Sequence, residues 1–231
     1  MEFLPSLTAF INLLLRGECP KEVQPVLFGG RLVALSKKGG GVRPIAVGYT
    51  LRRLASKCAN AVAVSRLTSY LQPIHLGAGI PGGCEAAVHA VRQYVKSMPS
   101  DHCVIKLDFT NAFNCLSREK MLLEVHNVIP ELYRFCHLSY SNPSLLQFDD
   151  WIISSEEGVQ QGDPLGPILF CLTIQPLLQT LISPLKAGFL DDITLGGRTE
   201  SLNKDVEAVM IGGKDLGLQL NVTKCEVIAM E

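Results

Sequence analysis

Short apolar runs separated by Gly and Pro predict two β-strands in the first fifth of the chain. Val26 to Ser36 has the composition of a strand or hairpin, and Val42 to Val47 that of a second short strand. Between them, the sequence Lys37-Lys38-Gly39-Gly40-Gly41 predicts a hairpin tip that carries two lysines. We therefore expect a β-hairpin ahead of the first long helix.

Apolar residues recur at helical spacing from Leu51 onward. We expect one side of this helix to face the core and its basic residues to lie on the exposed sides. The predicted core-facing residues are Leu51, Leu54, Ala55, Cys58 and Val62. The predicted exposed residues are Arg52, Arg53 and Lys57. After a loop from Gly77 to Gly83, a second helix is predicted to Ser97, with Ala87, Ala90, Val91 and Tyr94 on one side.

The centre of the chain alternates strands and helices. Val104 to Phe109 is rich in β-forming residues, so Asp108 is expected where a strand ends. Ser117 is expected to cap one helix, and Gly162-Asp163-Pro164 to begin another with Asp163 as its N-cap. The predicted apolar positions of these two helices are Met121, Leu122, Val125, Val128, Leu165, Ile168, Leu169 and Leu172.

A tight hairpin is expected in the C-terminal part. Phe189 to Leu195 places Asp191-Asp192 between apolar β-forming residues, which puts both acids at the predicted tip. A weaker helix, interrupted at Gly212-Gly213, then leads to a final strand pair around Leu218 and Val227.

The order of these elements predicts the α+β class, with helices packed on one face of an antiparallel sheet. Neither a repeat nor a low-complexity linker interrupts the 231 residues, so we expect a single domain over residues 1–231. A chain of this length with 47% hydrophobic residues can bury a sizeable core. Its eight cysteines are scattered without a C-x-x-C pair, which favours free core cysteines over disulfides or a zinc site.

The charge balance excludes a broadly basic surface. The formal net charge is −1 and the isoelectric point is about 6.5, so binding to nucleic acid would depend on local basic clusters. The apolar stretch that ends at Leu15 is short and broken by Pro5 and Asn12. It predicts neither a signal peptide nor a membrane span, and we expect an intracellular protein, in either nucleus or cytoplasm.

Adjacent carboxylates give the sharpest chemical signal. Asp191 and Asp192 at a hairpin tip repel each other unless solvent or a cation offsets their charge, and a solvated turn alone would explain them. Asp108 is also expected at a strand end, and a sheet can bring a strand end beside a hairpin tip. Three convergent carboxylates would suit two Mg²⁺ ions and an in-line phosphoryl displacement.

Four ordered segments extend this signal, and together they resemble the palm motifs of reverse transcriptases from non-LTR retroelements. They are Lys106-Leu107-Asp108-Phe109-Thr110-Asn111-Ala112-Phe113-Asn114, residues 158–167 (GVQQGDPLGP), Phe189-Leu190-Asp191-Asp192, and residues 216–226 (LGLQLNVTKCE). Two upstream segments, residues 37–57 and 77–83, resemble the fingers of the same enzymes. The similarity thus covers most of the chain.

The resemblance implies roles for individual residues. Asp108, Asp191 and Asp192 match the catalytic carboxylates that hold two Mg²⁺ ions, for which Mn²⁺ can substitute. Phe113 matches the position where an aromatic ring crowds a ribose 2′-hydroxyl, and Lys224 matches the position proposed to protonate pyrophosphate. The implied nucleotide-binding residues are Lys37, Lys38, Arg43, Phe109, Phe113, Gln161 and Gly162.

The resemblance also implies an architecture and partners. We expect a polymerase palm over about residues 101–231 and a partial fingers subdomain over about residues 20–100. The chain stops soon after the fourth motif, so we expect the thumb to be absent. The implied partners are an RNA or DNA template, a DNA primer, deoxynucleoside triphosphates and other parts of a longer retroelement protein, and no membrane.

Three functions remain open at this point. The first is an RNA-directed DNA polymerase domain, which the three acids favour. The second is a truncated, catalytically inactive remnant that at most binds nucleic acid or protein, which the missing thumb favours. The third is an unrelated Mg²⁺-dependent phosphohydrolase, which would have no use for Phe113 or for the Gln161-Gly162 loop.

Overall fold

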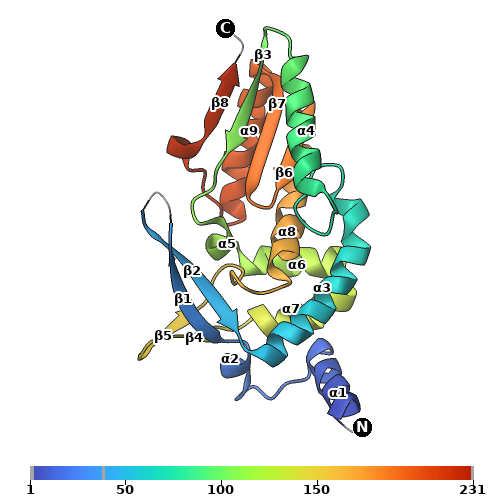
Figure 1. The fold of residues 1–231 in the computed structure, drawn as a ribbon, viewed down its shortest axis with the longest axis vertical. Coiled ribbons are helices and arrows are strands. Elements are labelled where there is room, and N and C mark those ends of the chain that lie inside the picture. The colour runs from blue at the N-terminus through green and yellow to red at the C-terminus, as the bar shows by residue number, and fades with distance from the viewer. Residues whose placement is uncertain (1–2, 38–39, 230–231) are drawn as a thin grey trace.

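The computed structural model describes residues 3–37 and 40–229 (Figure 1). Within these ranges, the helices are α1 (Phe3–Leu15), α2 (Gln24–Leu27), α3 (Thr50–Leu71), α4 (Gly83–Lys96), α5 (Ala112–Cys115), α6 (Arg118–Val128), α7 (Tyr133–Tyr140), α8 (Gly166–Thr180) and α9 (Thr199–Asp215). Two short 3₁₀ helices are η1 (Pro130–Leu132) and η2 (Val222–Lys224). The strands are β1 (Gly30–Ser36), β2 (Val42–Gly48), β3 (His102–Leu107), β4 (Ser144–Phe148), β5 (Trp151–Ser155), β6 (Leu185–Phe189), β7 (Asp192–Arg198) and β8 (Glu226–Ala229).

One four-stranded sheet has the order β6-β7-β3-β8, and all its neighbouring strands are antiparallel. On β7, Ile193 and Leu195 are buried in the main core together with Leu202 and Val209 of α9. The other face of this sheet carries α4, because Tyr94 lies against Gly196. The α+β class is therefore confirmed, but helices contact both faces of the sheet rather than one.

The second sheet has the order β2-β1-β4-β5, in which β1 and β4 run parallel. Its β1-β2 hairpin projects from the body of the molecule (Figure 1). Ala46 of β2 donates its backbone N–H to the carbonyl oxygen of Gln161, at 2.8 Å. This bond joins the sheet to the loop that precedes α8.

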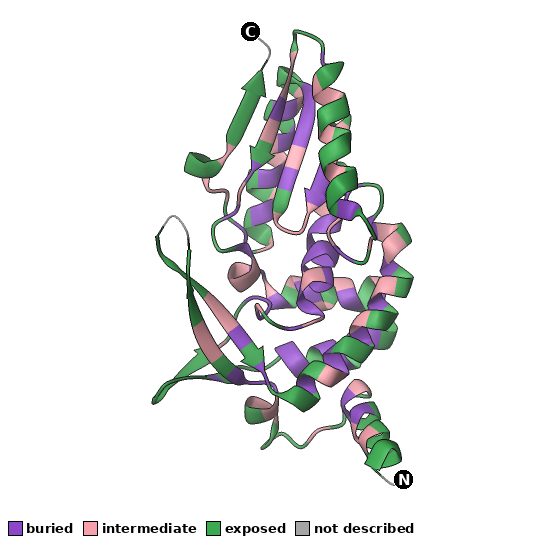
Figure 2. Cartoon of the chain, viewed as in Figure 1, coloured by how far each residue is buried: buried purple, intermediate pink, exposed green. Residues whose placement is uncertain are grey.

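Helix α8 forms the centre of the core and is buried on nearly all sides (Figure 2). Its residues at the predicted apolar positions Ile168, Leu169 and Leu172 are fully buried. The helix begins at Gly166, and the preceding Asp163 is not its N-cap. This part of the prediction was wrong by two residues, since Leu165 is the N-cap. The carboxylate of Asp163 accepts a hydrogen bond of 3.0 Å from the backbone N–H of Leu165 and also binds a buried arginine, described below.

Helix α3 was predicted correctly as an element, but with the wrong buried side. Leu51, Cys58 and Val62 are exposed, whereas Arg52 is fully buried. The buried residues of α3 are Arg52, Ala55, Ser56, Ala59, Ala63, Leu67 and Leu71. Four of these residues are Ala or Ser, so the strength of the apolar pattern did not indicate which side of α3 is buried.

Other elements also differ from expectation. Helix α9 runs through Gly212 and Gly213 without a break. Near the C-terminus, Leu220 forms an isolated bridge to Phe109, and β8 pairs with β3, so no strand forms at Leu218. Ser117 caps α6 as predicted, since its Oγ accepts a hydrogen bond from the backbone N–H of Lys120.

Two further expectations concern cysteines and membranes. All eight cysteines are free; Cys136 and Cys171 are in the core, whereas Cys58 and Cys84 are exposed. Burial raises the pKa of the Cys136 thiol. None of the helices in the described part of the chain combines the length and apolar character needed to cross a bilayer.

Candidate active site

Three acidic residues lie at one end of the sheet β6-β7-β3-β8. Leu107 of β3 pairs with Ile193 of β7. Asp108 and Asp192 are the next residues beyond this pair, so the antiparallel register sets them side by side. Asp191 lies in the turn between β6 and β7, after Leu190, whose backbone has a φ of 60°.

The three carboxylates interact electrostatically. Burial raises the pKa of Asp191, and the negative charges of Asp192 and Asp108 raise it further. Arg43 acts in the opposite direction. Such an arrangement of like charges is unfavourable without a cation, and carboxylate oxygens are the donors that Mg²⁺ and Mn²⁺ prefer. The chemistry of this donor set therefore fits a divalent metal.

Lys106 forms an ion pair with one of these acids. Its Nζ lies 3.2 Å from the Oδ1 of Asp192, and this contact raises the pKa of Lys106. Across residues 3–37 and 40–229, no three His, Cys, Asp or Glu side chains are arranged as a ready metal cage. Side chains at the end of the sheet would have to turn toward a metal for it to bind.

A pocket of about 400 Å³ adjoins the turn that carries Asp191. Its wall combines residues from β2, from α5, from the loop before α8 and from the β6-β7 turn. The lining residues are Arg43, Phe113, Gln160, Gln161, Gly162, Asp163, Pro167, Leu190 and Asp191. We call it the nucleotide pocket, because it brings together four of the predicted nucleotide-binding residues and one of the predicted catalytic acids.

Phe113 forms a rigid part of this wall. Its ring stacks on Phe170 of α8, with the ring centroids 4.7 Å apart and the planes inclined by 19°. Its carbonyl oxygen accepts a hydrogen bond of 2.7 Å from the backbone N–H of Val159. The stacking partner on the buried helix fixes the direction in which the Phe113 ring meets the pocket.

Gly162 has a backbone geometry that favours glycine. Its φ is +123°, and a Cβ there would lie 2.4 Å from the carbonyl oxygen of Ala46. Together with the hydrogen bond from Ala46 to Gln161, this contact seats the loop directly on β2. Arg43, on the same strand, is thereby brought to the pocket.

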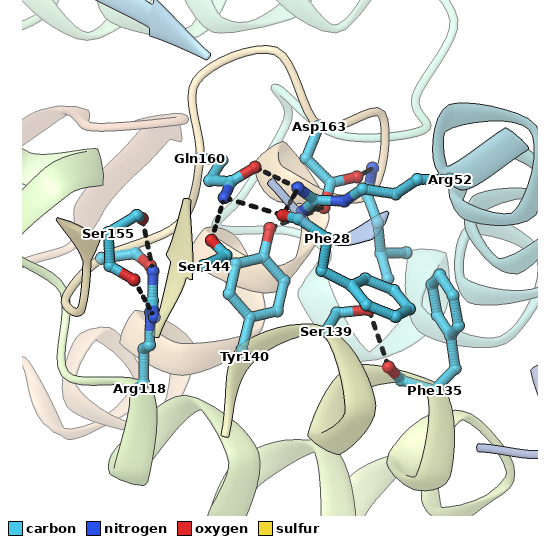
Figure 3. Close-up of polar contacts among 12 residues, drawn as sticks. Phe28, Arg52, Arg118, Phe135, Ser139, Tyr140, Ser144, Ser155, Gln160 and Asp163 are labelled. Carbon is cyan, nitrogen blue, oxygen red and sulfur yellow. Dashed lines mark hydrogen bonds and ion pairs between the residues drawn. The ribbon is translucent and has the colours of Figure 1, made fainter. Parts of the chain in front are cut away.

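A buried arginine holds the loop from its other side (Figure 3). Arg52 of α3 donates to the carboxylate of Asp163 at 3.0 Å and also to Gln160 Oε1 and the carbonyl oxygen of Phe28. The hydroxyl of Tyr140 donates to the same Asp163 oxygen at 2.6 Å, and burial raises the pKa of Tyr140. The Asp163 carboxylate thus links the pocket loop to α3 through the ion pair with Arg52 and to α7 through the hydrogen bond from Tyr140.

Arg118 fixes the start of the same loop. Its Nη1 donates to the carbonyl oxygen of Ser155 at 2.9 Å (Figure 3). Its Nε donates to the carbonyl oxygen of Gly158, also at 2.9 Å. Burial lowers its pKa. Sequence reasoning missed Arg52 and Arg118 as site residues, and a single sequence gives no signal that pairs Arg52 with an acid 111 residues away.

The remaining predicted site residues lie outside the nucleotide pocket. Phe109 is buried in the core, so its side chain does not reach a nucleotide in this pocket. Lys37 is exposed at the end of β1, and Lys38 lies outside the described residues. Lys224 is exposed in η2, three residues after Asn221, whose N–H donates to the carbonyl oxygen of Asp108.

Sequence comparison identifies relatives over most of the chain. Residues 35–231 match the family described as reverse transcriptase (RNA-dependent DNA polymerase). The chain is 27% identical to the retrotransposable element SLACS 132 kDa protein of Trypanosoma brucei gambiense, covering 97% of this chain and 20% of that protein. It is 29% identical to the Pol polyprotein from the type-2 retrotransposable element R2DM of Drosophila melanogaster, over 85% of this chain. The chain spans about a fifth of each relative's length.

Structural comparison gives the same fold. Apo telomerase from Candida tropicalis, truncated from its C-terminal domain, superposes with a TM-score of 0.67 at 13% identity, covering 90% of this chain and 51% of that one. Telomerase from Candida albicans with a fragment of telomeric RNA gives a TM-score of 0.66 at 12% identity, covering 92% and 43%. At these identities the likeness shows the fold alone.

Proposed function

The chain belongs to the reverse transcriptase family, as a domain of the non-LTR retrotransposon type, and on this premise we propose that it extends a primer 3′-hydroxyl by copying RNA into DNA. Because the relatives are much longer proteins, the proposal concerns the activity of this chain and not the activity of a whole relative. The observation that carries it is the nucleotide pocket, where Arg43, Phe113, Gln161 and Gly162 adjoin Asp191.

The carboxylates would hold the metal. When bound by Asp108, Asp191 and Asp192, two Mg²⁺ ions, or Mn²⁺ in their place, would activate the primer hydroxyl and stabilise the leaving oxygen. The chain's own contribution is to keep three oxygen-donating side chains at one end of a rigid sheet. The pKa of Asp191, raised mainly by burial and further by the charges of Asp192 and Asp108, supports this role.

Basic side chains would bind the triphosphate. Arg43 lines the nucleotide pocket with Asp191 and can form two parallel hydrogen bonds to a phosphate. Lys37 lies at the tip end of the projecting β1-β2 hairpin, directly after β1, and would approach the phosphates from outside, and we assign the same role to Lys38. We propose Lys224 as the acid that protonates pyrophosphate, since its turn is hydrogen-bonded to Asp108 through Asn221.

The pocket wall would select the sugar and position the base. The Phe113 ring, held by Phe170, would leave no room for a ribose 2′-hydroxyl. Gln161 and Gly162 would lie against the nucleotide, with Gly162 allowing close approach of the backbone. Phe109 could contribute through its backbone next to Asp108, because its side chain is buried.

We propose a single domain in which about residues 20–100 act as fingers and about residues 101–231 as palm. Its partners would be an RNA or DNA template, a DNA primer and deoxynucleoside triphosphates. The length of the relatives supports contacts with other parts of a longer retroelement protein as well.

Primer extension tests the proposal directly. The purified chain is incubated at low salt with a primed RNA template, deoxynucleotides and Mg²⁺, beside the variant Asp191→Asn/Asp192→Asn. Extension by the parent chain that is lost in the variant, with fold retained by circular dichroism, would support the polymerase and its metal site. A folded parent chain that does not extend any primer would refute it.

A catalytically inactive, nucleic-acid-binding domain is the second candidate. The contact between Lys106 and Asp192 favours it, because a lysine already satisfies one of the acids that a metal would need. The two candidates differ in the variant Lys106→Met. If the chain is a polymerase, freeing Asp192 should lower the Mg²⁺ concentration needed for extension; an inactive domain shows no extension at any concentration.

A further inference from the structure

A second pocket, of about 410 Å³, lies between the turn after α1 and helix α7. It shares no lining residue with the nucleotide pocket. Arg16 and Lys21 line it from the turn, and Arg134 and His137 line it from α7. We call it the basic pocket, and neither the sequence motifs nor the proposed polymerase chemistry uses it.

The two sides of the basic pocket are in direct contact. Gly17 has a φ of +76°, and a Cβ there would lie 3.1 Å from both the Cβ and the carbonyl oxygen of Arg134. Gln24 donates its side-chain N–H to the carbonyl oxygen of Cys19 at 2.9 Å, which closes the turn on itself. Arg16 and Arg134 are therefore held near each other by the backbone rather than by flexible side chains.

The charge of this pocket favours an anion. Three permanently charged cations and one histidine line it, and none of its lining residues is acidic. Glu18, outside the lining, pairs with Arg16 at 2.8 Å and also interacts with the charge of Arg134, so it offsets part of two of these positive charges. In a chain with a net charge of −1, this is a marked local excess of positive charge.

Aromatic rings lie beside the cations. The Tyr133 ring, which lines the basic pocket, contacts the His126 ring edge to face at 5.1 Å and the His137 ring at 5.5 Å. His137 is exposed and Tyr133 is partly exposed, so a ligand can reach these side chains. Cations for phosphates next to rings for base stacking are the pattern by which proteins bind single-stranded nucleic acid.

We propose that the basic pocket binds single-stranded nucleic acid, with Arg16, Lys21 and Arg134 contacting phosphates and Tyr133 and His137 stacking on a base. It would be a second contact for a strand, separate from the nucleotide pocket. The proposal does not depend on catalysis, because it concerns residues that take no part in the proposed reaction.

Fluorescence anisotropy with a labelled 15-nucleotide single-stranded RNA, without primer, nucleotide or Mg²⁺, tests this. The variant Lys21→Ala/Arg134→Ala is compared with Lys96→Ala/Lys204→Ala, which removes two exposed lysines of α4 and α9. We expect the first to weaken binding about tenfold at low salt and to reduce the slope of log affinity against log salt by about 1.4, since each phosphate contact contributes about 0.7. Equal affinities and slopes for the two variants would overturn the proposal.

Two further measurements identify the class of ligand. The variant Tyr133→Leu/His137→Ala should weaken RNA binding severalfold without changing the salt slope, because it removes stacking rather than charge. Inorganic phosphate at millimolar concentration should not displace the RNA; displacement at that concentration would mean a small-anion site and would refute strand binding. The variant Asp191→Asn/Asp192→Asn should retain RNA binding, so a failure of the polymerase proposal would be recognised separately.

Discussion

Arg52 and Asp163 are 111 residues apart in the chain, and their side chains form a buried ion pair with an N–O distance of 3.0 Å. The pair connects α3, which follows the β1-β2 hairpin, to the loop that lines the nucleotide pocket. Both side chains are almost completely inaccessible to solvent. The position of the pocket wall therefore depends on an ion pair that involves none of the three acids of the site.

Removing one partner of this pair should destabilise the fold strongly. For Arg52→Met we expect a loss of about 3–5 kcal/mol in the free energy of unfolding, because Asp163 would remain buried with its charge unpaired. Urea denaturation of the parent and variant chains measures this. The double variant Arg52→Met/Asp163→Leu should recover part of the loss. A loss below about 1 kcal/mol for Arg52→Met would contradict the buried pair.

The same pair shows where sequence reasoning fails. Helical spacing predicted that Arg52 would be exposed, since a charged residue off an apolar stripe is normally solvated. Asp163 in turn had the sequence context of an N-cap, ahead of Pro164. Each local assignment was reasonable by itself, and only the tertiary arrangement pairs the two charges and buries them.

The positions of the acids at strand ends and in a turn were predictable, because they depend on local sequence. Asp108, Asp191 and Asp192 follow or precede short β-forming runs, and strand ends and tight turns are local features. Their convergence required knowledge of the sheet order, which came from the family resemblance. By contrast, β4 and β5 were missed, because their apolar residues stand in short runs, Leu145-Leu146 and Trp151-Ile152-Ile153, that do not alternate with polar residues in the sequence.

Gly162→Ala should displace the pocket loop from β2. The substitution combines a strained φ of +123° with a Cβ only 2.4 Å from the Ala46 carbonyl oxygen. We expect more than about 3 kcal/mol of destabilisation, from backbone strain and the forced shift together, measured by urea denaturation.

Gly82→Ala is the matched control for this prediction. Gly82 also has a positive φ, of +67°, but nothing lies within 4 Å of the added Cβ. Strain alone should cost about 1 kcal/mol there. If the two variants lost equal stability, the close approach of the loop to β2 would have no energetic importance.

Phe113→Val should relax the choice between deoxynucleotides and ribonucleotides. The ring, stacked on Phe170, is expected to exclude the 2′-hydroxyl, and a smaller side chain would admit it. We expect the ratio of kcat/KM for the two nucleotides to fall by about 10- to 100-fold, the range that a pocket achieves against one added hydroxyl. Phe109→Leu, in the core, should reduce stability without changing this ratio.

His75 lies beneath the strand that leads to Asp191. It is completely buried, and neither ring nitrogen has a hydrogen-bond partner among the residues that the structure describes. Its ring packs against Gly188 of β6, where a Cβ would lie 2.7 Å from Nδ1. The backbone around it is firmly held, because Leu76 donates to Gly188 and Gly188 donates to Ile74, both at 2.8 Å.

Mild acid should therefore destabilise the fold through His75. Burial lowers its pKa to about 4, whereas the unfolded chain takes up a proton near pH 6.5. Stability is lost as the pH falls from about 6.5 toward 4, because over that range the unfolded state binds the proton and the folded state does not. Between pH 7.5 and 5 this amounts to about 2 kcal/mol, measurable by urea denaturation. Over the same pH range, the variant His75→Leu should lose about 2 kcal/mol less stability than the parent. The control His89→Gln, at an exposed position, should behave like the parent. Identical pH dependence in the parent and His75→Leu would show that His75 is not buried in the neutral form.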